Sequence, residues 1–307
     1  MPEIEKMFSS VCEQIEKQHI PVEGFAIMDR DACVLHEKRW TQDIPRDIYS
    51  NTKSFTGLAV GIAVSMGKLS VEDTVADWFD EELPKGHSPL LREMKLKHLL
   101  TMSSGFDREL LMYPDRRRGV GHPDYLNYLL SQQVLLPPGT RYCYSSGDSI
   151  LAGRMCEKAV GKGLPLFLYE TFFEKAGIQY PVWEHCPTGH ACGASGMHLT
   201  LREMMKLGVV YLNEGTFRDQ RIVDQDWARA ATRKQICVPG KKPWDDGYGY
   251  FLKTFPDGKC YRASGAFGQE TIVVPDRGLV LGFQCAHETD FSPVKKILDE
   301  EFFCRLG

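Results

Sequence analysis

The sequence predicts an α/β (α+β) fold in which one antiparallel sheet, flanked by helices, is built from both termini of the chain. Strand-like segments occur near the start of the chain and again after residue 200, whereas the signals between them are mostly helical. The length of 307 residues and the hydrophobic content of 43% suit one large domain or two interleaved ones. We therefore expect a sheet domain from residues 1–70 plus 200–307, an inserted all-helical subdomain at 71–199, and an active site between them.

Each expected element follows from a hydrophobic period or a turn signal. Residues 3–18 carry apolar side chains along one side of a helix, and residues 24–28 and 33–36 are typical of two short strands. The stretch 55–66 is apolar nearly all round, which predicts a central helix that is covered on every side, and Gly67 ends it. After residue 198 we expect helices at 199–213 and 226–232, strands at YGYFLK (248–253), KCYRAS (259–264), QETIVVP (269–275) and LVLGFQC (279–285), and a last helix at 294–303.

Composition excludes several classes of protein. The 37 basic and 41 acidic residues leave a net charge of −4, so there is no general electrostatic reason to expect nucleic acid as a partner. No run of about 18 apolar residues is present that could span a membrane. The charged, amphipathic N-terminal segment does not resemble an export signal, and the ten cysteines are scattered without a CxxC pair. We expect reduced thiols and a cytoplasmic location.

Two polar clusters invite a functional interpretation that we do not favour. The three arginines at 116–118 are most simply a solvated loop, with an anionic-ligand site as the alternative. Four residues that could bind zinc follow no zinc-finger spacing, so we expect neither a metal nor a cofactor; they are His185, Cys186, His190 and Cys192.

Common catalytic signatures are missing from the sequence, which has no G-x-S-x-G elbow, HExxH, P-loop or dinucleotide GxGxxG. A Ser-x-x-Lys spacing is present instead, and it occurs three times, at Ser50/Lys53, Ser65/Lys68 and Ser292/Lys295. Ser65 lies at the C-terminal end of the apolar helix, and Ser292 precedes a proline at an expected helix start. Only Ser50 lies at the beginning of the buried helix.

The position of Ser50 has chemical consequences. Three residues of separation place Ser50 and Lys53 on one helical face, within hydrogen-bonding reach. Burial disfavours the charge of a lysine, so Lys53 could accept the proton of Ser50. The N–H groups at a helix start also point toward an oxyanion formed on a substrate that Ser50 attacks. On these residues alone, Ser50 could instead cap the helix, with Lys53 in solvent.

Further motifs follow in a fixed order along the chain. They are YSNTKSFT (49–56), GKLS with an acidic pair after it (67–73), KHLLTMSSG (97–105), PGTRYCYSS (138–146), the stretch 191–207, GYGY (247–250) and ASGAFGQ (263–269). Together they resemble the serine β-lactamase and penicillin-binding-protein family, in particular its class C branch and the related esterases. The resemblance covers roughly residues 20–285.

The resemblance implies roles for particular residues. Ser50 would be the nucleophile that forms an acyl-enzyme, Lys53 would hold or accept its proton, and Tyr144 would complete the base. The backbone N–H groups of Ser50 and Ala266 would form the oxyanion hole. Substrate contacts would come from Ser146, Ala263, Ser264 and Gly265.

Two of these residues depart from the family's pattern. Ser146 replaces the usual asparagine of the second motif, and Ala263 replaces the lysine or histidine that begins the third. The missing cation helps relatives to bind a substrate carboxylate, which shifts our expectation from a penicillinase toward an esterase or amidase. Arg262 or Lys259 could compensate, although strand alternation points Arg262 to the side of Ser264.

We therefore expect a serine hydrolase that cleaves a small-molecule ester, amide or β-lactam through an acyl-enzyme on Ser50. A β-lactamase or a D-Ala-D-Ala carboxypeptidase is the alternative within enzymes. A non-catalytic sensor module of the penicillin-binding type is the alternative outside them. Tyr142, two residues before Tyr144, is expected to serve only packing.

Overall fold

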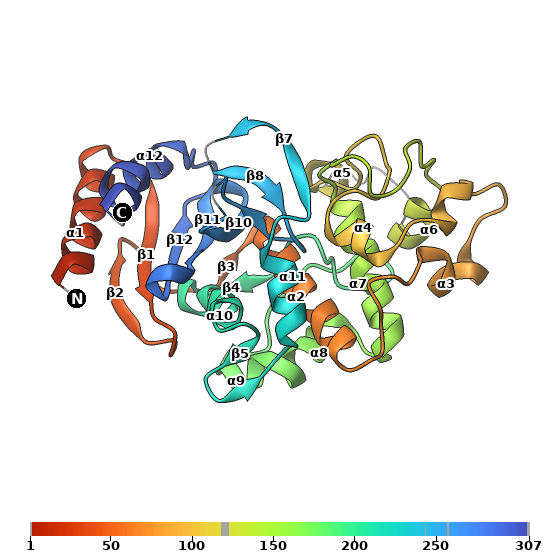
Figure 1. Ribbon diagram of the computed structural model, residues 1–307, viewed down its shortest axis with the longest axis horizontal. Helices are drawn as coiled ribbons and strands as arrows, with labels where there is room; N and C mark the ends of the chain where they lie inside the picture. The colour runs from red at the N-terminus through yellow and green to blue at the C-terminus, as the bar shows by residue number, and fades with distance from the viewer. Residues whose placement is uncertain (1, 118–122, 243, 257, 306–307) are drawn as a thin grey trace.

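The computed structural model describes residues 2–117, 123–242, 244–256 and 258–305. Within these ranges an antiparallel sheet with the strand order β2-β1-β12-β11-β10-β9-β8-β7 occupies one half of the molecule (Figure 1). Two strands from the start of the chain therefore pair with six from its last third, which confirms the expected fold class. The bounds are β1 Val22–Met28, β2 Val34–Arg39, β7 Ile236–Lys242, β8 Asp245–Tyr248, β9 Lys253–Thr254, β10 Tyr261–Gly265, β11 Gln269–Val274 and β12 Leu279–Cys285, with the short pairs β3 Arg46–Asp47/β4 His198–Leu199 and β5 Thr216–Phe217/β6 Gln220–Arg221.

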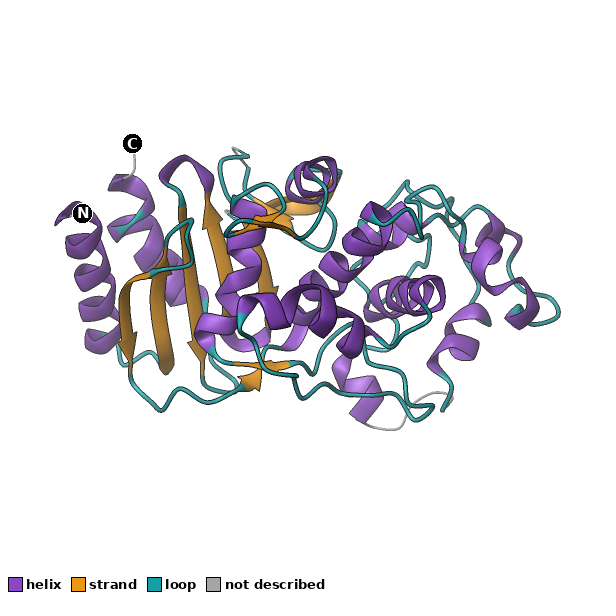
Figure 2. Cartoon of the chain, turned by 90° about the horizontal axis from the view of Figure 1, so that it is seen from below, coloured by secondary structure: helices purple, strands orange, loops and turns teal. Residues whose placement is uncertain are grey.

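Helices cover both faces of the sheet (Figure 2). The helices α1 and α12, near the two ends of the chain, lie side by side on one face, over a core that includes the stacked rings of Phe25 and Phe283. Helix α10 packs on the opposite face, against β1, β11 and β12. The bounds are α1 Pro2–Lys17, α10 Leu201–Leu212, α11 Gln225–Thr232 and α12 Ser292–Glu301.

A second hydrophobic core, separate from the one beneath α1 and α12, extends from the sheet into the helical half of the molecule. Its centre is α2 (Thr52–Ser65), whose residues from Thr52 to Ala63 are all buried, as the apolar stretch predicts. The described helices around it are α3 Val75–Phe79, α4 Leu96–Leu100, α5 Tyr113–Arg117, α6 Tyr125–Leu130, α7 Ser146–Val160, α8 Leu164–Leu168 and α9 Glu174–Ala176. Among the described residues, no helix has the length and apolar character needed to cross a membrane. The division of the chain after residues 70 and 199 stays a prediction.

The segment YGYFLK differs from its prediction as one strand. It forms the end of β8, a tight connection, and the first residue of β9. Gly249 donates its N–H to the Leu252 carbonyl, and Phe251, with a φ of +54°, donates to the Leu100 carbonyl of α4. A Cβ at Gly249 would lie 2.0 Å from the Ala231 carbonyl oxygen. Close packing against α4 and α11 therefore overrides the strand pattern. The edge strand of the sheet on this side is β7, which the sequence analysis did not predict.

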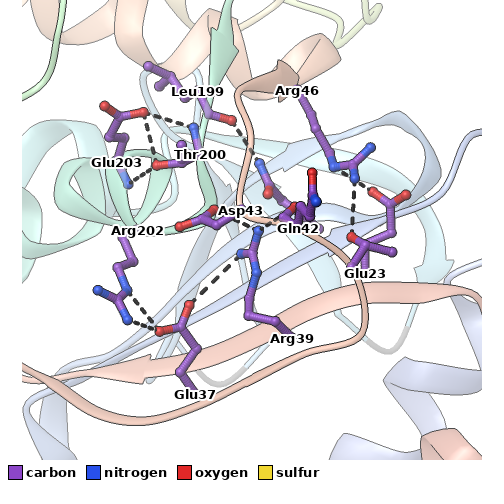
Figure 3. A network of polar contacts seen from close by, with 12 residues as sticks. Glu23, Glu37, Arg39, Gln42, Asp43, Arg46, Leu199, Thr200, Arg202 and Glu203 are labelled. Carbon is purple, nitrogen blue, oxygen red and sulfur yellow. Dashed lines mark hydrogen bonds and ion pairs between the residues drawn. The ribbon is translucent and has the colours of Figure 1, made fainter.

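Polar contacts fix the segment that connects β2 to the second half of the fold (Figure 3). Arg39 pairs with Asp43 at 2.6 Å, and Arg46 pairs with Glu23 of β1 at 2.8 Å. The short strand β3 then pairs with β4, directly before α10. Each of these partly buried ion pairs adds modest stability, and together they hold the backbone that leads to Ser50.

Candidate active site

Ser50 lies in a short 3₁₀ turn between β3 and α2, and the backbone before it is held firmly. The Ile48 N–H donates to the Met197 carbonyl at 2.9 Å, and the Tyr49 N–H donates to a carboxylate oxygen of Asp47 at 2.7 Å. Tyr49 has a φ of +46°, which is rare for a large side chain. Strained backbone of this kind persists only where the surroundings enforce it, and it concentrates at functional sites.

Lys53 is 1% exposed and lies in the first turn of α2. Its Nζ donates to the Ser50 Oγ at 3.2 Å and to the Ala194 carbonyl at 2.9 Å. The same Nζ lies 5.0 Å from the centre of the Tyr144 ring. The structure thus brings together the three side chains that the sequence singled out, from two segments almost a hundred residues apart.

Tyr144 lies on the loop before α7, where the Ser145 hydroxyl accepts the Gly147 N–H at 3.1 Å and caps the helix. Burial of the Tyr144 phenol acts to raise its pKa. The charge of Lys53, a hydrogen bond with Ser50 and the charge of Lys253 outweigh that effect and leave the pKa below its ordinary value. A tyrosine in this setting is suited to accept a proton.

Tyr142 has a different environment from Tyr144. Its ring packs against that of Tyr248, with centroids 5.5 Å apart, and burial raises its pKa well above the ordinary value. The nearby acidic groups raise the Tyr142 pKa further, whereas the charges of Lys53 and Lys253 lower that of Tyr144. These properties suit a packing residue.

Lys253 is a residue of this site that the sequence did not identify. It lies on β9, paired with Arg262 of β10, and lines a cavity of about 420 Å³ together with Tyr144. Its Nζ is 3.7 Å from a carboxylate oxygen of Asp245, and its side chain is 28% exposed. The only sequence signal was a lysine at the end of an expected strand, which gave no reason to place it beside Tyr144.

Asp148 is a second residue that the sequence did not identify. It is completely buried in the first turn of α7, and one carboxyl oxygen accepts the Ser104 hydroxyl at 2.9 Å. The other oxygen has no hydrogen-bond partner among the described residues. Burial raises the pKa of Asp148 from 3.8 to about 8, against the opposing effects of Ser104 and Lys53. The Asp148 carboxyl group therefore holds its proton to a higher pH than an exposed aspartate does.

The expected substrate contacts on β10 lie at its C-terminal end. The carbonyl of Ala263 accepts the side-chain amide of Asn51 at 3.3 Å, which ties β10 to the start of α2. The Ser264 hydroxyl donates to Glu270 at 2.7 Å, on the side of the sheet where Arg262 also bonds to Glu270. This confirms the expected alternation along the strand.

Ser146 is the first residue of α7, and Ala266 directly follows β10. Ser146 is 3% exposed, and its hydroxyl lies 3.4 Å from the Met112 sulfur. Ala266 follows Gly265, at which a Cβ would come within 2.2 Å of the Ile48 carbonyl oxygen. Glycine is therefore required where β10 passes the turn that contains Ser50. The substrate-binding roles of these residues stay predictions.

Arg262 does not supply the missing cation of the third motif. Its side chain is 1% exposed and pairs with Asp245 at 2.7 Å and with Glu270 at 2.5 Å. Its charge is therefore balanced inside the sheet. Lys259 lies in the connection between β9 and β10.

The expectation of a solvated loop at 116–118 is wrong for Arg116. This side chain is 1% exposed and forms an ion pair with Glu184 at 3.1 Å. It also donates to the Leu111 carbonyl at 2.6 Å and to the Ser195 hydroxyl. Arg116 thus joins the loop before α5 to the segment that carries Ala194, while the side chains of residues 117 and 118 lie outside the described part.

The histidines and cysteines at 185–192 have partners other than a metal. His185 Nδ1 contacts the Trp183 carbonyl at 2.7 Å, and His190 Nδ1 contacts Glu157 at 2.8 Å. Burial raises the pKa of the Cys192 thiol. Within the described residues, no group of three or more His, Cys, Asp or Glu side chains could hold a metal ion.

Solved structures share the fold of this chain. The Octameric penicillin-binding protein homologue from Pyrococcus abyssi superimposes with a TM-score of 0.74 at 20% identity, over 99% of this chain and 78% of that one. A family VIII carboxylesterase superimposes with a TM-score of 0.77 at 16% identity, over 99% and 98% of the two chains. Identities this low show a shared fold.

Sequence comparisons give the family. A curated relative named "Probable fimbrial assembly protein FimD, serogroup H1", from Dichelobacter nodosus, is 30% identical over 134 residues. That match covers 43% of this chain and 34% of the relative, so the chain spans about a third of that protein's length. The model of the family described as Beta-lactamase matches residues 9–296. Because this match spans nearly the whole chain, the protein belongs to the Beta-lactamase family.

Proposed function

We propose that this protein is a serine hydrolase of the class C type that cleaves an ester or amide bond through an acyl-enzyme on Ser50. The observation that carries the proposal is the partly buried contact of 3.2 Å between the Ser50 Oγ and the Lys53 Nζ, with Tyr144 beside both. An activated serine needs a proton acceptor within hydrogen-bonding distance; here Tyr144 is suited to accept the proton, while Lys53 donates to the Ser50 Oγ and its charge favours the phenolate.

In the proposed first step, the Ser50 Oγ attacks the carbonyl carbon of the substrate and its proton passes to Tyr144, next to Lys53. The carbonyl π electrons move to the oxygen, and the backbone N–H groups of Ser50 and Ala266 stabilise the resulting oxyanion. When the carbonyl forms again, the bond to the leaving alcohol or amine breaks, and that group takes the proton from Tyr144. Water then attacks the Ser50 ester by the same route, which releases the acid and restores the serine.

The preference for esters over β-lactams rests on the third motif. Ala263 carries no charge, and Arg262 is paired with two carboxylates. Lys253 supplies a positive charge near Tyr144 from β9 instead, and we infer that it favours the Tyr144 phenolate. The likeness in fold to a family VIII carboxylesterase is consistent with this preference.

A fluorophosphonate probe tests the nucleophile, because it forms a stable covalent bond with an activated serine. We expect the wild type to be labelled and Ser50→Ala to lose the label completely. Ser292→Ala is the matched control, since Ser292 has the same Ser-x-x-Lys spacing but lies exposed at the start of α12. Labelling that survives in Ser50→Ala would contradict the proposal.

Substrate choice is tested by comparing p-nitrophenyl esters with nitrocefin. We expect faster turnover of the esters, because the third motif provides no cation for the carboxylate of a cephalosporin. Efficient nitrocefin hydrolysis would favour the β-lactamase alternative. A burst of acylation without later turnover would favour the sensor alternative, and fractionation of expressing cells would test the predicted cytoplasmic location.

A further inference from the structure

Three aromatic side chains lie directly beside the proposed oxyanion hole: Tyr49, Phe267 and His287. We call them the aromatic bracket. Tyr49 immediately precedes Ser50, and Phe267 immediately follows Ala266. Each of the two proposed N–H donors therefore has one member of the bracket as its neighbour in the chain.

The members of the bracket contact one another across the gap between the two segments. The rings of Tyr49 and Phe267 meet edge to face, with centroids 5.1 Å apart and an angle of 84°. The imidazole of His287 packs against Phe267 at 4.6 Å, and its Nδ1 lies 3.0 Å from the Tyr49 hydroxyl. Edge-to-face pairs of this kind add directional attraction beyond the burial of their surface.

The backbone supports a role beyond packing. Tyr49 has a φ of +46° and Phe267 a φ of +60°, both in the left-handed region that large side chains avoid. Such conformations persist only when the surrounding structure over-determines them. The rings are the parts of these residues that meet each other, so the ring contacts are well placed to hold both strained conformations.

The backbones of the two segments also approach each other closely. Gly265 passes so near the Ile48 carbonyl that a Cβ would lie 2.2 Å from its oxygen. The two segments thus touch both through their backbones and through their rings. A change in either contact would alter the separation of the Ser50 and Ala266 N–H groups.

We propose that the aromatic bracket is a positioning device for the oxyanion hole, which holds the N–H groups of Ser50 and Ala266 at the separation that the tetrahedral transition state needs. The proposal rests on the proposed function, because it takes Ser50 as the nucleophile. Its members do not touch the reacting atoms; they act through the two peptide groups beside them. Since an oxyanion hole binds the transition state more tightly than the substrate, its misplacement lowers kcat more than it raises KM.

The main test is Phe267→Gly, which removes one ring and lets the backbone leave the left-handed region. Hydrolysis of p-nitrophenyl butyrate should show kcat reduced roughly 10- to 100-fold, with KM changed by no more than about two-fold. The inhibition constant of phenylboronic acid should rise by a similar factor, because its tetrahedral adduct with Ser50 places an oxygen in the hole. A purely structural role would lower the melting temperature without moving these two quantities together.

Ala32→Gly is the matched control. Ala32 has a φ of +61° in the turn between β1 and β2, so the variant brings the same backbone freedom at a place outside the site. We expect its kcat and its inhibition by phenylboronic acid to match the wild type. Equal behaviour of Phe267→Gly and Ala32→Gly would overturn the proposal.

Two milder variants keep the proposal testable if Phe267→Gly does not fold. Tyr49→Phe removes the hydroxyl that contacts His287. His287→Ala removes the imidazole, and because the His287 side chain is 57% exposed, this change leaves no buried cavity. Each should lower kcat by roughly 3- to 10-fold with KM nearly constant. An unchanged kcat in both variants would overturn the positioning role of the aromatic bracket but not the role of Ser50 as nucleophile. If the wild-type protein is not labelled by the fluorophosphonate, both proposals are wrong.

Discussion

Lys53 and Arg262 are two cations with the same burial and opposite surroundings. Each is 1% exposed; Lys53 lies on α2 and Arg262 on β10. Arg262 has two carboxylates, from Asp245 and Glu270, at 2.7 Å and 2.5 Å. Lys53 contacts a hydroxyl, a carbonyl and the ring of Tyr144, and no described carboxylate forms an ion pair with it.

The contrast separates a structural charge from a chemical one. A buried charge is costly unless it is paired, so Arg262 with its two carboxylates forms a closed group that joins β8, β10 and β11. The charge of Lys53 is not neutralised in this way, and it acts on the nearby Ser50 and Tyr144. Loss of Lys53 should therefore affect activity, whereas loss of Arg262 should affect stability.

The largest effect is expected from Lys53→Met, which keeps the volume of the side chain but removes its charge. The kcat/KM for p-nitrophenyl butyrate should fall roughly 100- to 10,000-fold, the range of general acid–base catalysis. Thermal unfolding should stay at or above the wild-type temperature, because an unpaired buried charge is lost. Lys68→Met is the control with the same Ser-x-x-Lys spacing, and it should keep full activity.

Arg262→Met tests the other half of the comparison. It leaves Glu270 without an ion-pair partner and Asp245 with only the longer contact to Lys253, so urea unfolding should show a loss of about 3–5 kcal/mol. Adding Glu270→Gln to this variant should recover part of the loss, since one of the unpaired charges disappears. A stable Arg262→Met protein with low activity would contradict the separation drawn above.

Lys253→Met tests a lysine that lies near both the Arg262 ion-pair group, through Asp245, and the proposed catalytic group, through Tyr144. Removing its positive charge should raise the pKa of Tyr144 and so move the acidic limb of the kcat/KM profile to higher pH. The rate should fall several-fold in mildly acidic solution and little in alkaline solution. Lys253→Arg keeps the charge and should keep the profile; a Lys253→Met profile identical to the wild type would show that this charge does not act on Tyr144.

The smallest effect is expected from Asp148→Asn. Because burial raises the Asp148 pKa from 3.8 to about 8, the folded protein keeps this proton in a pH range where the unfolded chain has released it. The contribution of Asp148 to stability is therefore present at low pH and is lost as the pH rises from about 4 to about 8.

Asparagine does not titrate, so the variant should lose this part of the pH dependence. Between about pH 5 and about pH 8, we expect the melting temperature of the wild type to fall more than that of Asp148→Asn, by roughly 2–5 °C. Asp226→Asn, at an exposed position of α11, serves as the control and should behave like the wild type. Parallel curves for all three proteins would contradict the expectation.

Local patterns predicted much of the fold correctly. The expected strands at 269–275 and 279–285 became β11 and β12, and the apolar stretch after Ser50 became α2. These predictions are correct because the period of the hydrophobic residues reflects which face of a strand or helix is buried. The segment YGYFLK failed because its backbone bonds to α4 and packs against α11, which its own pattern does not contain.

The sequence by itself determined the family, the order of its motifs and the spacing that allows Ser50 and Lys53 to contact each other. That contact is local, since residues three apart on a helix share a face whatever surrounds them. Only the tertiary structure decided the partners that come from elsewhere in the chain: Lys253 beside Tyr144, the carbonyl of Ala194 on Lys53, and the aromatic bracket around Ser50 and Ala266. These contacts join segments separated by tens to hundreds of residues, so they depend on how the sheet and helices pack and leave no periodic signal along the chain.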